Sequence, residues 1–127
     1  SSYRINDDIQ LISDIDRIDL VLDQAIPCGL LVNELITNSL KYAWPNQKKA
    51  TIKMGLKEMN GEVLLRIGDD GIGLPMPFEE LNTDTLGLQL VVTLVEQLDG
   101  KLSVNSENGT EYLVKFENIK SRPNGKD

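Results

Sequence analysis

Three polar residues at helical spacing form the first group that could carry out chemistry. Glu34, Asn38 and Lys41 would share one face of a helix that advances about 100° per residue, with Tyr42 near its edge. An asparagine amide oxygen is a hard ligand that Mg²⁺ accepts beside phosphate oxygens and water. A lysine ammonium can approach a phosphate, and a carboxylate one turn before the asparagine can accept a proton. The face therefore suits a magnesium nucleotide.

Periodicity alone favours a different interpretation of this face, an ordinary solvated helix surface with a favourable charge pair. Two features favour a site instead. Asn38 is a poor helix former in the middle of a helix. Tyr42, Ala43 and Trp44 also bring aromatic bulk beside the polar face, as the wall of a pocket requires.

An acidic turn containing two glycines is the second group. A strand-like run at residues 63–68 continues into Asp69-Asp70-Gly71-Ile72-Gly73-Leu74-Pro75. Glycines at this spacing let the backbone turn sharply and approach a ligand closely. The turn matches neither a Walker phosphate loop, nor a Rossmann fingerprint, nor a calcium-binding EF-hand loop. A buried carboxylate there would accept a hydrogen bond from the exocyclic amine of adenine, and a plain surface turn is the alternative.

A glycine before an apolar helical pattern is the third group, in Thr85-Leu86-Gly87-Leu88-Gln89-Leu90-Val91. A glycine at a helix start exposes backbone N–H groups, and the helix dipole favours an anion there. Taken alone, the segment is better explained as a loop-to-helix junction.

Two helices and several strands must position these groups. The first helix is predicted from a cap at Asp23 to about Ala43, with Pro27 tolerated only in its first turn and Val32, Ile36, Ser39 and Ala43 facing a sheet. The second is predicted at about residues 86–98, ending at Asp99-Gly100. Residues 9–12 and 18–22 are predicted to be extended. Alternating apolar residues predict two hairpins, which turn at Asn60-Gly61 and near Asn108-Gly109.

These elements predict an α+β fold, a two-layer sandwich. Its mostly antiparallel, mixed sheet of about five strands would be covered on one face by about three helices. Residues 1–117 are predicted to form a single domain, and residues 118–127 a disordered tail.

Composition narrows the possible functions. The chain has 127 residues and a formal charge of −7, with no basic stripe, so we expect no nucleic-acid partner and no membrane contact by this domain. No apolar run is long enough to span a bilayer. No histidine is present, which excludes serine–histidine and cysteine–histidine catalysis within the chain. The single Cys28 predicts a small buried side chain and a reducing, cytoplasmic setting.

The order of the three groups resembles the Bergerat-type ATP-binding fold of sensor histidine kinases, DNA gyrase, mismatch-repair ATPases and heat-shock chaperones. Residues 33–42 look like the N box of that fold, residues 69–75 like the first glycine box and residues 85–91 like the second. Residues 108–112 resemble its closing glycine-threonine element. The match is closest to the catalytic domains of histidine kinases, in the subgroup with a variant dimerisation domain.

This resemblance implies a set of site residues. Asn38 would coordinate Mg²⁺, Lys41 would meet a phosphate and Glu34 would stand where related ATPases keep a general base. Asp69 would accept the adenine amine. The full set of ATP-binding residues implied is Asn38, Lys41, Tyr42, Asp69, Gly71, Gly73, Leu86, Gly87, Leu88 and Thr110, with Glu34 and Lys41 as the catalytic pair.

The chain also departs from the family pattern. Only Gly87 remains of the two or three glycines usual in the second glycine box, and Thr83, Asp84 and Thr85 stand in the other places. The segment at residues 76–84 is short for an ATP lid, and Phe78 is either the lid aromatic or part of the core.

The resemblance implies an ATP-dependent protein histidine kinase domain with ATP and Mg²⁺ as cofactors. It would transfer the γ-phosphoryl group to a histidine outside this chain, on an upstream dimerisation domain, for relay to a response regulator. Two alternatives stay open. One is an anti-sigma-factor serine kinase, and the other is a nucleotide-sensing module without catalysis.

Overall fold

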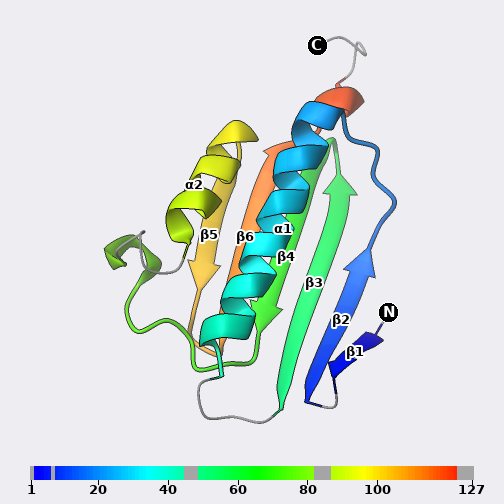
Figure 1. Ribbon diagram of the computed structural model, residues 1–127. Helices are drawn as coiled ribbons and strands as arrows, with labels where there is room; N and C mark the ends of the chain where they lie inside the picture. The colour runs from blue at the N-terminus through cyan, green and yellow to red at the C-terminus, as the bar shows by residue number, and fades with distance from the viewer. Residues whose placement is uncertain (1, 7, 45–48, 82–86, 123–127) are drawn as a thin grey trace.

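The computed structural model describes residues 2–6, 8–44, 49–81 and 87–122 (Figure 1). The elements in chain order are β1 (Ser2–Asn6), β2 (Ile9–Ile15), α1 (Leu22–Tyr42), β3 (Ala50–Met59), β4 (Glu62–Asp69), the 3₁₀ helix η1 (Phe78–Glu80), α2 (Leu88–Gln97), β5 (Lys101–Asn105), β6 (Thr110–Glu117) and the 3₁₀ helix η2 (Ile119–Ser121). Among the described residues, no helix combines the length and the apolar character needed to cross a membrane.

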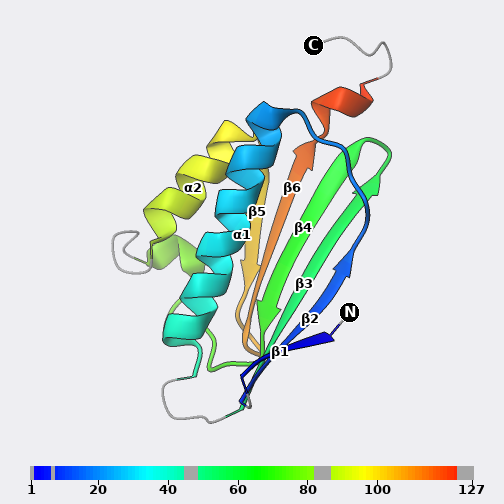
Figure 2. The ribbon, with the colours of Figure 1, turned by 45° about the vertical axis from the view of Figure 1, so that its right-hand side comes forward.

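One mixed sheet carries both helices on the same face (Figures 1 and 2). Its strand order is β1-β2-β3-β4-β6-β5, and every neighbouring pair is antiparallel except β2 and β3. The predicted two-layer α+β sandwich is therefore confirmed.

The number of elements differs from the prediction. The described residues form a sheet of six strands, because residues 2–6 pair with β2 as an edge strand. Residues 18–21 form the connection into α1 and not a strand. Within the part of the chain that the structure describes, the helical layer contains two α-helices and not about three, and the two further helices are single 3₁₀ turns.

The buried face of α1 is wider than the predicted one, of which Ser39 and Ala43 are buried. Leu31 and Leu35 are fully buried, whereas Val32 and Ile36 are only partly buried against the same core. The face is wider because α2 packs beside α1, in addition to the sheet beneath it (Figure 1). Burial therefore extends round to Asn38. The helix start also differs, because Val21 is the N-cap and Asp23 lies in the first turn. Pro27 is inside the helix, beyond the first turn.

Turn chemistry sets the strand and helix ends. Asn60 and Gly61 have φ angles of 55° and 79°, and they connect β3 to β4 as predicted. Asp99, at φ 50°, follows the end of α2. Asparagine, aspartate and glycine tolerate this left-handed region better than other residues, which is why the sequence located these ends.

Order continues past residue 117, where a disordered tail was expected. The Asn118 side chain is 1% exposed and donates to the Asp19 carbonyl oxygen at 2.9 Å and to Glu58 Oε1 at 3.0 Å. The Gln24 side chain donates to the Glu117 carbonyl oxygen and accepts from the Ile119 N–H. These long-range hydrogen bonds hold residues 118–121 against the start of α1, and residues 123–127 lie outside the described part of the chain.

Candidate functional site

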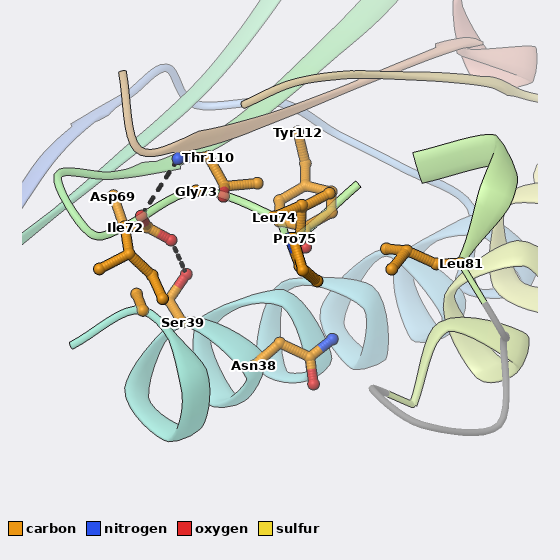
Figure 3. Close-up of a pocket in the computed structure, with 11 residues that line it drawn as sticks. Asn38, Ser39, Asp69, Ile72, Gly73, Leu74, Pro75, Leu81, Thr110 and Tyr112 are labelled. Atoms are coloured by element: carbon orange, nitrogen blue, oxygen red, sulfur yellow. Dashed lines mark hydrogen bonds between the residues drawn. The ribbon is translucent and has the colours of Figure 1, made fainter. Parts of the chain in front are cut away.

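A cavity of about 350 Å³ lies between the second half of α1 and the ends of β4 and β6. Cavities of this size accept small molecules. Figure 3 shows Asp69 and Thr110 at one side, Leu81 at the other, and the Tyr112 ring behind Leu74 and Pro75. The lining residues are Asn38, Ser39, Ala43, Asp69, Ile72, Gly73, Leu74, Pro75, Leu81, Thr110 and Tyr112.

The Asp69 carboxylate is held by three hydrogen bonds at the end of β4. Its Oδ1 accepts from the backbone N–H of Gly71 at 3.0 Å and of Thr110 at 3.2 Å. Its Oδ2 accepts from the Ser39 hydroxyl at 2.7 Å (Figure 3). A carboxylate offers about four acceptor positions, so one position on Oδ2 is left for a donor in the cavity.

The turn after Asp69 packs directly on the end of α1. A side chain on Gly71 would overlap Ala43, and the Ile72 N–H donates to the Ala43 carbonyl oxygen at 2.8 Å. Asp70 Oδ1 accepts from Trp44 Nε1 at 2.9 Å, which fastens the turn to the residue after α1. These contacts give the turn a single position relative to the helix.

A second close approach fixes the start of β6. Gly109 has a φ of 80°, and a side chain there would overlap the Asp69 carbonyl oxygen. Thr110, which follows it, is 5% exposed and lies opposite Asp69 in the β4–β6 ladder. The glycine therefore allows the Thr110 N–H to reach the Asp69 carboxylate.

Asn38 provides an unsatisfied polar group in the cavity wall. Its side chain is 6% exposed, and its Nδ2 has no hydrogen-bond partner within the described residues. A buried polar group without a partner costs about 1–3 kcal/mol, so a ligand that pairs with this amide recovers that free energy. The amide also carries an oxygen of the type that Mg²⁺ accepts, so the residue fits a magnesium nucleotide.

Glu34 and Gly87 lie beside Asn38. Gly87 is the N-cap of α2 with a φ of 67°, and a Cβ built there would lie 2.9 Å from Glu34 Oε2 and 3.7 Å from Asn38 Oδ1. The start of α2, where the first N–H groups of a helix have no partner within the helix, thus faces the carboxylate and amide of α1. This is the type of helix end that accepts an anion.

Most of the predicted site residues gather here, and some do not. Asn38, Asp69, Gly73 and Thr110 line the cavity, and Gly71, Glu34 and Gly87 stand next to lining residues. Lys41 is exposed and outside the lining, and Leu88 is fully buried in the core. Leu86 and the side chain of Tyr42 lie outside the described part of the structure.

Sequence reasoning missed several lining residues, of which Ser39 is the most important. Its side chain faces the sheet as expected, and it bonds there to Asp69 at the end of β4, a contact that was not predicted. The only sequence signal was its position directly after Asn38. Tyr112 was predicted as a strand residue, and its ring contacts the Phe78 ring edge-on at a centroid distance of 6.5 Å. Phe78 is therefore partly buried against the core, behind the cavity wall.

The Tyr112 hydroxyl makes the stability of the fold depend on pH. Burial, assisted by the nearby Asp69 carboxylate, raises the pKa of Tyr112 from 10.0 to about 12. Between these values the folded protein keeps a proton that the unfolded chain loses. Stability should therefore be intact below about pH 10 and decline as pH rises towards about 12, by about 2–3 kcal/mol. Urea unfolding at stepped pH should show this decline in the native chain and a smaller one in Tyr112→Phe, and equal declines would contradict the assignment.

The chain matches one known protein family and several of its members. Residues 23–119 match the family model described as the histidine kinase-, DNA gyrase B- and HSP90-like ATPase. The chain is similar to Blue-light-activated histidine kinase 2 of Erythrobacter litoralis, with 32% identity over 80% of this chain and 30% of that protein. It is also 31% identical to the sensor histidine kinase PdtaS of Mycobacterium tuberculosis, over 73% of this chain and 19% of that protein. The chain thus spans less than a third of the length of these kinases.

The fold is shared with solved kinase structures. The histidine kinase domain of the Erythrobacter litoralis EL346 blue-light-activated histidine kinase superposes with a TM-score of 0.80 at 27% identity, over 91% of this chain and 54% of that chain. The catalytic domain of histidine kinase ThkA superposes with a TM-score of 0.69 at 20% identity, over 87% of this chain and 78% of that chain.

Proposed function

Because the chain belongs to the family of histidine kinase-, DNA gyrase B- and HSP90-like ATPases, we propose that it is the ATP-binding catalytic domain of a sensor histidine kinase. In this proposal it transfers the γ-phosphoryl group of ATP to a histidine outside the chain. The acceptor belongs to a dimerisation domain, from which a response regulator takes the phosphoryl group. A domain that consumes ATP works where ATP is supplied, so we place it in the cytoplasm.

The cavity around Asp69 and Asn38 is the observation that supports this proposal most strongly. Asp69 has one acceptor position left, which suits the amine of adenine. The buried Nδ2 of Asn38 has no partner among the described residues and can donate to a phosphate oxygen of the same ligand, while the amide oxygen would hold Mg²⁺. Both side chains line one cavity, so a single molecule can contact both.

In phosphoryl transfer, the residues of this chain would position the reacting groups and stabilise charge on the phosphates. Asn38 would hold Mg²⁺, which when bound neutralises charge on the phosphates. The start of α2 at Gly87 offers N–H groups to the phosphates, and the exposed Lys41 is free to swing towards them. A nitrogen of the acceptor histidine attacks the γ-phosphorus, the bond to the bridging oxygen breaks and ADP leaves. Glu34, beside Gly87, would orient the imidazole or accept its proton.

Removal of Asn38 tests the metal end of the site. Asn38→Ala should abolish the Mg²⁺ dependence of ATP binding while the fold stays intact, because the amide oxygen that would hold the metal is gone. Calorimetric titration with ATP, with and without Mg²⁺, measures the effect. Asn33→Ala, an exposed position on the same helix, is the matched control and should behave like the native chain. If Asn38→Ala keeps full Mg²⁺ dependence, Asn38 is only a structural residue.

An anti-sigma-factor serine kinase is the second candidate. The chain is 29% identical to an anti-sigma F factor of Clostridium botulinum, over 80% of this chain and 76% of that protein. Unlike the sensor kinases, this relative is matched over most of its own length. The acceptor would then be a protein serine, and the product would be an acid-stable phosphoserine in place of an acid-labile phosphohistidine.

A further inference from the structure

We propose that Ser39 is a positioning residue that sets the preference of the cavity for a purine carrying a 6-amino group. Its hydroxyl fixes the Asp69 carboxylate so that one acceptor position of Oδ2 is presented to the ligand. The inference rests on the proposed ATP-binding function and adds to it the residue that orients the base-reading group.

The hydrogen bonds of Asp69 fix the orientation of its carboxylate. Oδ1 is occupied by the two backbone N–H groups of Gly71 and Thr110. The Ser39 hydroxyl donates to Oδ2 at 2.7 Å, a short and therefore strong contact with a carboxylate oxygen. With three of about four acceptor positions in use, the carboxylate has one orientation and accepts one more donor.

The packing around Ser39 fixes the position of its hydroxyl relative to Asp69. Ser39 is 3% exposed, and it lies one turn before Ala43, against which Gly71 packs too closely for any side chain. The backbone bond from the Ile72 N–H to the Ala43 carbonyl oxygen joins the helix to the turn beyond Asp69. Neither the hydroxyl nor the carboxylate can move independently, so the Ser39–Asp69 bond is built into the fold.

Loss of the Ser39 hydroxyl should change how the Asp69 carboxylate binds a ligand. Without it, Oδ2 has two open positions on the cavity side, and water can occupy both in competition with a ligand amine. Binding of a purine with an amine should weaken. A purine with hydrogen at position 6 makes no bond to Asp69, so its affinity should not change.

The test compares ATP with purine riboside triphosphate, which lacks the 6-amino group, by calorimetric titration in the presence of Mg²⁺. Ser39→Ala should weaken ATP binding about tenfold, the scale of one hydrogen bond to a charged group, and leave the analogue within about twofold. Ser39→Cys, close in size but a weak donor, should behave like Ser39→Ala, and Ser39→Thr should retain the preference. Ser121→Ala is the control, since that hydroxyl donates to Glu58 at 2.8 Å outside the cavity.

The outcomes separate this inference from the proposed function. Equal weakening of both nucleotides in Ser39→Ala and Ser39→Cys would overturn the positioning role, and so would an unchanged preference for ATP. If Ser39→Ala does not fold, Ser39→Cys decides between these results. If the native chain binds both nucleotides equally, the adenine-reading site itself is wrong and the proposed function loses its support.

Discussion

Replacing Asp69 with alanine should weaken ATP binding by about 1.5–3 kcal/mol, or roughly 10- to 150-fold. The carboxylate is the acceptor left open in the cavity, and its bond to the adenine amine would be charge-assisted. Guanine presents a carbonyl oxygen at the same place, so GTP should bind poorly to the native chain and lose little in the variant.

The neighbouring carboxylate provides a matched control for this change. Asp70 accepts from Trp44 Nε1 at 2.9 Å and from the Thr51 N–H at 3.0 Å, and it is not part of the cavity lining. Asp70→Ala should reduce stability and leave the affinity for ATP nearly unchanged. Calorimetry on both folded variants measures the difference, and an Asp69→Ala protein that binds ATP as tightly as the native chain would refute the base-reading role.

We also expect that the chain does not phosphorylate itself. The chain should bind Mg-ATP yet acquire no stable phosphoryl label, because it has no histidine to receive one. Hydrolysis should also be slow. A water molecule would have to replace a nucleophile that the acceptor domain holds in line, and such positioning is worth about 7–11 kcal/mol of the barrier at its upper limit.

Local chemistry made much of the fold predictable. Asn60-Gly61 adopts the positive φ angles that a tight hairpin needs, and strict alternation on both sides placed β3 and β4. Gly71 and Gly109 stand where a side chain would overlap the neighbouring backbone, so the sequence marked these positions directly. Asp69 and Thr110, next to them, line the cavity, and their roles in nucleotide binding stay a prediction that the family resemblance implies.

The orientation of α1 was less predictable, because it depends on two neighbours. A helix that packs on a sheet alone would bury one narrow stripe, and the sequence pattern was interpreted in that way. With α2 beside it, α1 buries Leu31 and Leu35 at the centre and Asn38 and Ser39 at one end. No local pattern encodes the contact between the two helices, so the burial that extends from Leu31 and Leu35 to Asn38 could not be predicted.

The sequence also did not predict that side-chain hydrogen bonds hold residues 118–121 in place. Asn118 is buried because Asp19 and Glu58, both far away in the sequence, accept its amide hydrogens. A polar sequence that contains Pro123-Asn124-Gly125 has the composition of a disordered tail, and the partners that order residues 118–121 are visible only in three dimensions.

Transfer of labelled phosphate tests whether the chain acts as the catalytic domain of a histidine kinase. The isolated chain is mixed with Mg²⁺ and ATP labelled at the γ position, with and without a dimerisation segment that carries the acceptor histidine, and Asp69→Ala serves as the binding-deficient control. We expect no stable label on the chain itself and an acid-labile, base-stable label on the added segment. An acid-stable label on a serine, in this chain or in a protein partner, would contradict the histidine kinase assignment and establish the serine kinase in its place.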